Sequence, residues 1–259
     1  RGRYVLRSAS LATRAAATYG GVVSMRSAAE RHGWEQRKVP DLPDITFPRN
    51  HRVERVARKV LVPHWSELGA DDVVAGVTSK RRTLIDCMRN LPLEEAVSIV
   101  DSALRARDIS FGALRVLAAA MRGRGRARAM AVAAMASPRA ANPFESTLRA
   151  IASTIPGLHV EPQRPIRLAE DHVARPDLVD EAMKIVIEAE SFEWHGESAA
   201  MTRDCVRYNA FTNQGWTVIR FSWWQVIFMP AYVAGVLASA VALVRGHANV
   251  ARGSPERHA

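Results

Sequence analysis

Cysteine is scarce in this sequence, which contains only Cys87 and Cys205 and no CxxC pair. No paired histidines lie near either cysteine. A structural zinc site needs several closely spaced Cys or His ligands, and a disulfide-stabilised domain needs more cysteines than these. The sequence therefore predicts neither kind of site, and its cysteine usage favours a reducing, cytoplasmic location.

Long uninterrupted hydrophobic runs are also absent. The first residues, RGRYVLRSAS, are too charged to form the apolar core of a signal peptide. Residues 221–244 are the one membrane candidate, but Gln225 and Pro230 interrupt them. The part after Pro230 is shorter than the ~20 residues that cross a bilayer. We expect a buried helix from Pro230 to Val244 and no membrane partner.

Acidic residues are in the minority, because 26 Asp and Glu stand against 36 Lys and Arg and give a net charge of +10. A domain this basic attracts polyanions, so nucleic acid is the first expected partner and an acidic membrane surface the second. An arginine-rich composition without a specific partner is the alternative. The length of 259 residues suffices for two globular domains.

Residues 1–136 predict a mostly helical α+β region. Short helices are expected at 12–17 and 25–32, a strand at 45–47 and a small sheet over 53–77. Apolar residues then recur at helical spacing, and DISFGALRVLAAAMR predicts a further helix. Either Asp108 or Ser110 is a suitable cap for that helix.

An arginine-rich segment, RGRGRARAM, follows this region and places Arg122, Arg124, Arg126 and Arg128 on alternate positions. Its two glycines predict a loop that leads into the next helix. Arginine side chains suit phosphate oxygens, so a loop that contacts phosphates is one interpretation. A solvated linker is the other.

The segment SPRAANPFES, residues 137–146, predicts a domain boundary followed by a helix. Asn142 is the expected cap, Pro143 the first helical residue, and Glu145 the acid that reaches back in a capping box. We therefore expect a second domain at 137–245.

The pattern of this second domain predicts a helix, three strands, a helix, a strand and a final helix. The strands are expected near 158–162, 173–178 and 183–190, and the long helix over 199–213. The strand WTVIRF and the helix at Pro230 complete an α/β domain, and residues 246–259 are expected to be a flexible tail. The aromatic residues in and after WTVIRF are expected in the core: Trp216, Phe221, Trp223 and Trp224.

Two glutamates end the strand from Met183 to Glu190. Side chains alternate along a strand, so Glu188 and Glu190 share one face. The preceding hairpin, DLVDEAMK, can bring Asp177 beside them. Three carboxylates this close repel by roughly 1–4 kcal/mol per pair, so the arrangement needs a positive partner.

Two partners are available. The first is a divalent cation with hard oxygen ligands, Mg²⁺ or Mn²⁺. The second is arginine, because Arg203 and Arg207 lie at i, i+4 on one face of the following helix.

Three motifs carry a resemblance to a known family: PFESTLR, PDLVDEAMKIVIEAE and TRDCVRYNAFTNQGWTVIRF. They resemble the nuclease-like domain related to very-short-patch repair endonucleases, within the PD-(D/E)xK nucleases, over roughly residues 140–243. The resemblance implies a restriction-endonuclease-like mixed sheet flanked by helices. In that family an acid-bearing helix precedes the core and the metal acids follow on a hairpin. An R-D-x-x-R-x-N helix comes next, and a GW-x-V-x-R-F strand closes the sheet.

By position, the resemblance implies Asp177 and Glu188 as ligands of Mg²⁺ or Mn²⁺ and Glu145 as the acid of the first helix. Glu190 stands where many of these enzymes have lysine and closer relatives often have aspartate. A glutamate there could accept a proton or serve as a further metal ligand. His195 is the candidate general base, with a structural histidine as the alternative.

The N-terminal part resembles AbiEi-type antitoxins of abortive-infection toxin–antitoxin systems. The motifs are RGRYVL, SMRSAAERHGW and GVTSKRRTLIDCMRNLPLEEAVSIVDSALR. In such proteins a winged helix-turn-helix usually precedes the first motif. This chain starts at that motif, so we expect the DNA-reading helix-turn-helix to be absent.

Two functions are compatible with these features. The first is a bacterial, DNA-associated, metal-dependent endonuclease that hydrolyses phosphodiester bonds, in which Arg203 or Arg207 holds phosphate oxygens; RNA as the substrate stays open. The alternative is a non-catalytic DNA-binding antitoxin or transcriptional regulator of a type IV toxin–antitoxin system, with a cognate toxin as partner. The nuclease requires acids that converge in an open basic cleft. For the alternative we expect Arg203 and Arg207 to form ion pairs with the acids, which leaves no coordination position for a metal.

Overall fold

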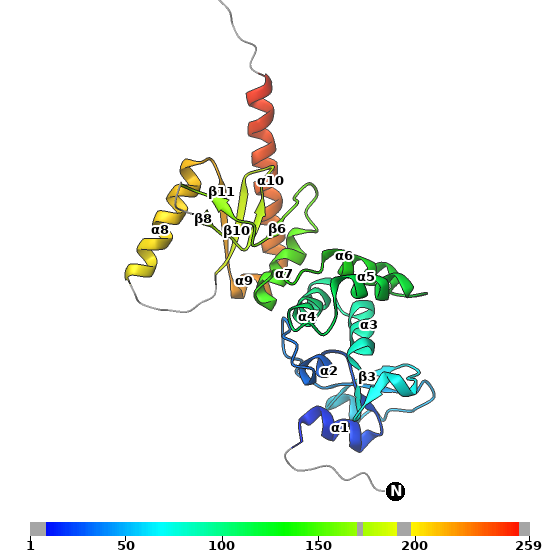
Figure 1. Ribbon diagram of the computed structural model, residues 1–259. Helices are drawn as coiled ribbons and strands as arrows, with labels where there is room; N and C mark the ends of the chain where they lie inside the picture. Colours follow the sequence, from blue (N-terminus) through cyan, green and yellow to red (C-terminus); the bar gives the residue numbers. More distant parts are fainter. Residues whose placement is uncertain (1–8, 170–172, 191–197, 254–259) are drawn as a thin grey trace, which may run out of the picture. The chain divides into compact units, whose positions relative to one another are not determined.

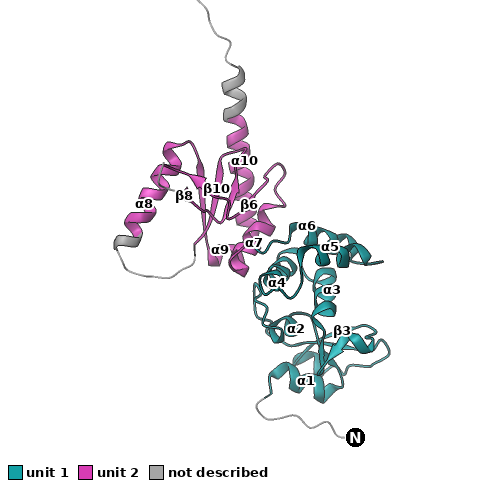
Figure 2. Ribbon diagram, in the orientation of Figure 1, with its two compact units in different colours: residues 1–138 teal, residues 139–259 magenta. Residues whose placement is uncertain are grey.

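The computed structural model describes residues 9–169, 173–190 and 198–253, with side chains described for all of these except 198–200 and 247–253. The chain divides into two compact units, residues 1–138 and 139–259 (Figure 2). Each unit combines a mixed sheet with helices, which confirms the expected α/β class (Figure 1).

The first unit contains a small sheet with the strand order β3-β2-β1-β5-β4 and helices that follow it in the chain. Strands β1 and β2 are antiparallel, whereas β2 and β3 are parallel. Its elements are α1 (Leu11–Tyr19), β1 (Val22–Val23), α2 (Met25–Arg31), β2 (Asp44–Phe47), η1 (Ala57–Lys59), β3 (Val62–Trp65), η2 (Ala70–Asp72), β4 (Val73–Val74), β5 (Val77–Thr78), α3 (Lys80–Asn90), α4 (Leu93–Arg105), α5 (Phe111–Ala120) and α6 (Arg126–Met135).

Serine side chains cap several of these helices, including the one for which the sequence offered Asp108 or Ser110. Ser110 caps α5 by accepting a hydrogen bond from the backbone N–H of Ala113 at 3.2 Å. Asp108, the other expected cap, instead accepts a hydrogen bond from Trp34 Nε1 at 2.7 Å and pairs with Lys80. An N-cap acceptor satisfies one of the N–H groups that the first helical turn leaves unpaired.

The second unit has the order helix, three strands of one sheet, helix and strand. Its sheet has the order β11-β10-β9-β6, in which β10 pairs in parallel with β11 and antiparallel with β9. Its elements are α7 (Pro143–Ala152), β6 (Glu161–Pro162), β7 (Ile166–Arg167), β8 (Val173–Ala174), β9 (Leu178–Asp180), β10 (Ile185–Glu190), α8 (Ser198–Asn213), β11 (Thr217–Ser222), α9 (Trp223–Phe228) and α10 (Pro230–Gly253). Strands β7 and β8 form a separate ribbon.

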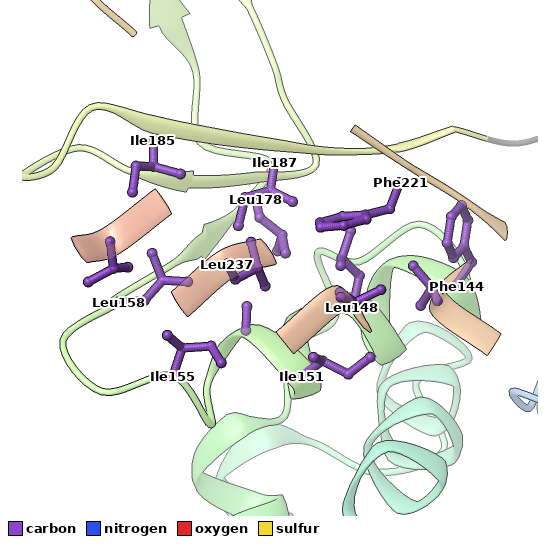
Figure 3. Packing of buried hydrophobic residues seen from close by; sticks show 14 residues of the cluster. Phe144, Leu148, Ile151, Ile155, Leu158, Leu178, Ile185, Ile187, Phe221 and Leu237 are labelled. Atoms are coloured by element: carbon purple, nitrogen blue, oxygen red, sulfur yellow. The ribbon is translucent and has the colours of Figure 1, made fainter. Parts of the chain in front are cut away.

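The central strand β10 is buried on both faces. Ile185 and Ile187 pack into a core shared with α7 and α10, including Leu148 and Leu237 (Figure 3). Val186 lies on the opposite face, in a cluster with Phe211 of α8. This alternation confirms the predicted one and places Glu188 and Glu190 on the side that α8 covers (Figure 1).

The end of the chain differs from the expectation. A short helix, α9, follows β11 because Ser222 and Gln225 form a capping box. Its buried residues are Val226 and Ile227, whereas Trp223 and Trp224 are 43% and 61% exposed. Their expected place in the core is therefore wrong, although Phe221 is buried as predicted.

The last helix, α10, begins at the expected Pro230 and continues to Gly253, into the residues expected to form a tail. Within the described ranges, no helix combines the length and the apolar character that spanning a bilayer requires.

Candidate functional site

The hairpin of β9 and β10 places two of the predicted acids side by side. Leu178 pairs with Ile187 across the hairpin, so the residues that follow in the register are Asp177 and Glu188. The backbone N–H of Asp177 donates to Glu188 Oε2 at 3.3 Å, and Asp177 Oδ2 accepts from the backbone N–H of Ala189 at 2.7 Å. The predicted pairing of these two acids is therefore present.

Glu145 lies at the first turn of α7, where it takes part in the helix cap. Asn142 Oδ1 accepts from the Glu145 backbone N–H at 2.9 Å, and Asn142 Nδ2 donates to Glu145 Oε1 at 3.0 Å. Glu145 Oε2 accepts from the backbone N–H of Ala141 at 2.8 Å. The acid thus reaches back as a capping-box residue does, but to the residue before the cap.

Gln163 joins this helix acid to the hairpin acid. Its Nε2 donates to Glu145 Oε2 at 3.2 Å and to Asp177 Oδ1 at 3.0 Å, while its backbone N–H donates to the Asp177 carbonyl at 3.0 Å. The residue has a positive φ of 54°. The sequence analysis missed Gln163, because a single amide between two short strands belongs to no periodic pattern.

Glu188 is a buried carboxylate, with 5% of the residue exposed. Burial raises its pKa to about 7, which the attraction of Arg207 opposes and the nearby carboxylate of Asp177 reinforces. Arg207 Nη1 lies 3.3 Å from Glu188 Oε1, an ion pair. Among the described residues, however, Oε1 has no hydrogen-bond partner.

Asp177 has a similar but weaker tendency. Burial raises its pKa, although the hydrogen bonds from Ala189 and Gln163 favour the ionised form. Two adjacent acids whose pKa values are both raised by burial form an electrostatically strained pair. Such pairs are typical of functional sites.

Glu190 has a different environment at the end of the same strand. Its Oε1 accepts hydrogen bonds from the Tyr208 hydroxyl at 2.8 Å and from Arg220 Nε at 2.7 Å. Although burial opposes ionisation, these bonds outweigh it and lower the pKa of Glu190. The parallel register of β10 and β11 brings Arg220 to this edge, and the sequence analysis missed both donors.

The two arginines predicted beside the acids differ in position. Arg207 pairs with Glu188, and its Nη2 also donates to Asp204 at 3.2 Å and to the Tyr208 hydroxyl at 2.8 Å. Arg203 is exposed and has no hydrogen bond or ion pair within the described part of the chain. Arg220 thus takes the place beside the acids that the helical spacing suggested for Arg203.

A metal site of three acids is not preassembled. In the residues that the structure describes, no group of three or more His, Cys, Asp or Glu side chains could hold a metal ion. Glu190 is turned to Tyr208 and Arg220, which leaves the pair of Asp177 and Glu188. Two carboxylates fit a hard cation such as Mg²⁺, which usually keeps several waters and takes further oxygens from a substrate phosphate.

The remaining predicted residues are one histidine and the arginine-rich segment. His195 is outside the described residues. The arginine-rich segment belongs to the first unit, where Arg128 Nη1 donates to the carbonyls of Asn90 at 3.4 Å and Leu91 at 3.2 Å. These carbonyls lie at the end of α3, so Arg128 serves as a cap there. The side chains of the other three arginines are exposed: Arg122, Arg124 and Arg126.

Comparison of the chain with protein-family models, with curated proteins and with solved structures gives no match. The geometry of this site and its motifs are therefore the basis for a function.

Proposed function

We propose that residues 139–259 form a restriction-endonuclease-like domain that hydrolyses phosphodiester bonds of DNA with a divalent cation held by Asp177 and Glu188. The observation that carries the proposal is the buried pair itself. Glu188 Oε1 is buried and has no hydrogen-bond partner among the described residues. Its positive neighbour is Arg207 Nη1 at 3.3 Å, but a buried carboxylate oxygen without a hydrogen bond still costs free energy, which a bound cation would lower.

The order of elements supports the same proposal. The motif resemblance implies an acid on a first helix, acids on a hairpin, an arginine-bearing helix and a closing strand. In the second unit these are α7 with Glu145, the β9–β10 hairpin, α8 with Arg207, and β11 next to β10. The Gln163 amide links the acids of the helix and the hairpin, which places them in one site rather than on separate surfaces.

The side chains of the site have different roles in the proposed hydrolysis. A divalent cation, when bound, lowers the pKa of a coordinated water and stabilises charge on the attacked phosphate. Asp177 and Glu188 supply its carboxylate ligands, and Gln163 keeps Asp177 in place. Arg207, paired with Glu188 at 3.3 Å, brings a guanidinium group to the place where a phosphate oxygen would lie.

Glu190 has a positioning role in this proposal. It holds the Tyr208 hydroxyl and the Arg220 guanidinium, which stacks 4.4 Å from the centre of the Tyr208 ring. Both groups line the strand end beside Arg207, whose guanidinium lies 4.8 Å from the same ring. The network keeps positive charge next to the carboxylate pair, where a substrate phosphate would need it.

One observation favours the non-catalytic alternative, a DNA-binding antitoxin or transcriptional regulator. Each of these carboxylates already has a donor or a cation from the protein, and Arg207 supplies the positive partner of Glu188. In that case the acids and arginines form a structural network, and no cation binds. The two candidates differ in metal dependence.

Plasmid nicking by the full-length protein in Mg²⁺, in Mn²⁺ and in EDTA tests the proposal. We expect nicking that requires the cation and falls at least ~100-fold in Glu188→Gln, in line with the loss of a group that acts on the transition state. Glu181→Gln is the matched control, because Glu181 is an exposed hairpin acid paired with Arg164. If the wild-type protein shifts DNA on a gel but does not nick it, the nuclease proposal is wrong and the non-catalytic alternative holds.

A further inference from the structure

A second polar site lies in the first unit, within residues 1–138. It is a cavity of about 370 Å³ between β3 and the C-terminal half of α3. The side chains that the argument uses are His64, Trp65, Arg82, Asp86, Arg89 and Arg124.

The charges that line this cavity do not cancel. Arg82 is neutralised, because its Nε donates to Asp86 Oδ2 at 2.9 Å and its Nη1 to Asp72 Oδ2 at 3.2 Å. Arg89 and Arg124 have no carboxylate partner in the part of the chain that the structure describes. Arg82 and its two carboxylate partners carry one net negative charge, so Arg89 and Arg124 together leave an excess of one positive charge.

The arginine-rich loop is held against this cavity by its backbone. Arg89 Nη2 donates to the Arg122 carbonyl at 2.7 Å. Gly125 has a φ of +81°, and a Cβ there would lie 2.9 Å from the Arg89 carbonyl oxygen. Only glycine suits this combination of left-handed backbone and close approach, so the loop sequence fixes Arg124 in the cavity wall.

His64 is fixed from the opposite wall. Its Nε2 lies 2.8 Å from Oδ1 of Asp44, a fully buried carboxylate that Arg26 also holds at 3.0 Å and 3.2 Å. Hydrogen bonds from His64 and Arg26 lower the pKa of Asp44 although burial opposes this. The ring nitrogen Nδ1 of His64 has no partner among the described residues and is left for a ligand.

We infer that this cavity binds the phosphate group of a nucleotide or of a nucleic-acid strand, with Arg89 and Arg124 as charge partners and His64 beside them. Arginine is the preferred partner of phosphate oxygens. The volume exceeds that of a bare phosphate and lies in the range of small-ligand pockets. Trp65, which is 41% exposed, carries the Arg58 guanidinium 5.6 Å from its ring centre and so adds a further positive group beside the cavity.

The test compares Arg124→Gln with Arg81→Gln in the full-length protein, in EDTA so that no metal chemistry interferes. Both arginines are exposed and without a described partner, so neither change removes a contact that holds the fold. Arg81 also lies on α3 but does not line the cavity. The probes are a fluorescein-labelled DNA duplex followed by anisotropy and adenosine monophosphate followed by calorimetry.

If a nucleic-acid strand is the ligand, Arg124→Gln should weaken duplex binding about tenfold and reduce the salt dependence by about one phosphate contact. Arg81→Gln should have a smaller effect on both the affinity and the salt dependence. If a free nucleotide is the ligand, the same difference should appear with adenosine monophosphate alone. Equal effects of the two variants on both probes would overturn the inference. The carboxylate residues are unchanged in this test, so its outcome is independent of the proposed nuclease activity.

Discussion

Glu188 shows how burial decides the charge state of a single residue. Its pKa is raised to about 7 in the folded protein, against an ordinary value of 4.5. The native state therefore binds a proton that the unfolded chain has lost between these pH values. The stability that protonated Glu188 contributes is complete below the unfolded pKa and is lost as the pH rises through about 7.

We expect Glu188→Gln to reverse this loss. The variant has no charge to desolvate, so its stability relative to wild type should increase with pH, by up to about 3 kcal/mol between pH 5 and pH 8. Urea unfolding of both proteins at the two pH values measures the difference. A stability difference that does not change with pH would contradict a buried Glu188 carboxylate whose desolvation outweighs its attraction to Arg207.

The sequence was informative about which acids matter and uninformative about what holds them. Strand alternation predicts the shared face of Glu188 and Glu190, and the hairpin predicts the place of Asp177. The sequence could not separate the roles of the two glutamates. That separation depends on the register of β10 with β11, which places Arg220 opposite Glu188, and on the Arg220 side chain, which reaches along the strand to Glu190. Gln163 was missed for a similar reason, because its contacts join parts of the chain that no local pattern connects.

At the scale of elements, the N-terminal cap of α7 both stabilises the helix and positions an acid of the candidate site. Asn142 uses its side-chain oxygen to accept from the Glu145 N–H and its amide to donate to the Glu145 carboxylate. The two bonds have separate consequences. The first stabilises the helix, and the second orients the acid.

Two substitutions separate these contributions. Asn142→Ala removes both bonds and should cost ~1–2 kcal/mol of unfolding free energy. Asn142→Asp keeps the acceptor for the helix but places a second carboxylate beside Glu145, so it should be destabilising at pH 8 and recover near pH 4, where carboxylates protonate. Urea unfolding across pH measures both. An Asn142→Asp variant as stable as wild type at pH 8 would show that the amide donor does not matter.

The elements themselves were largely predictable, because their periodicity and caps are local. The helices of the first unit and the hairpin follow from such patterns. The short helix α9 was not predicted, since its six residues, Trp223–Phe228, are too few to show a period. The apolar character of Trp223 and Trp224 suggested burial, but the helix turns Val226 and Ile227 inward instead.

At the scale of the whole molecule, the net charge of +10 and the two units suit a protein that meets a polyanion through more than one surface. The second unit carries the buried carboxylate pair, and the first carries the arginine-lined cavity. The proposed nuclease activity depends on the site around this pair and not on the cavity. Whether that pair binds a cation or is satisfied by Arg207 is the central question.

Calorimetric titration of Mn²⁺ into the full-length protein at pH 8 answers it most directly. The account predicts saturable binding in wild type and in Glu181→Gln, and its loss in Glu188→Gln. It also predicts that binding weakens toward pH 5, because protons compete for Glu188 below its pKa of about 7. Absence of binding in wild type, or binding that survives in Glu188→Gln, would contradict the assignment of Asp177 and Glu188 as a metal site.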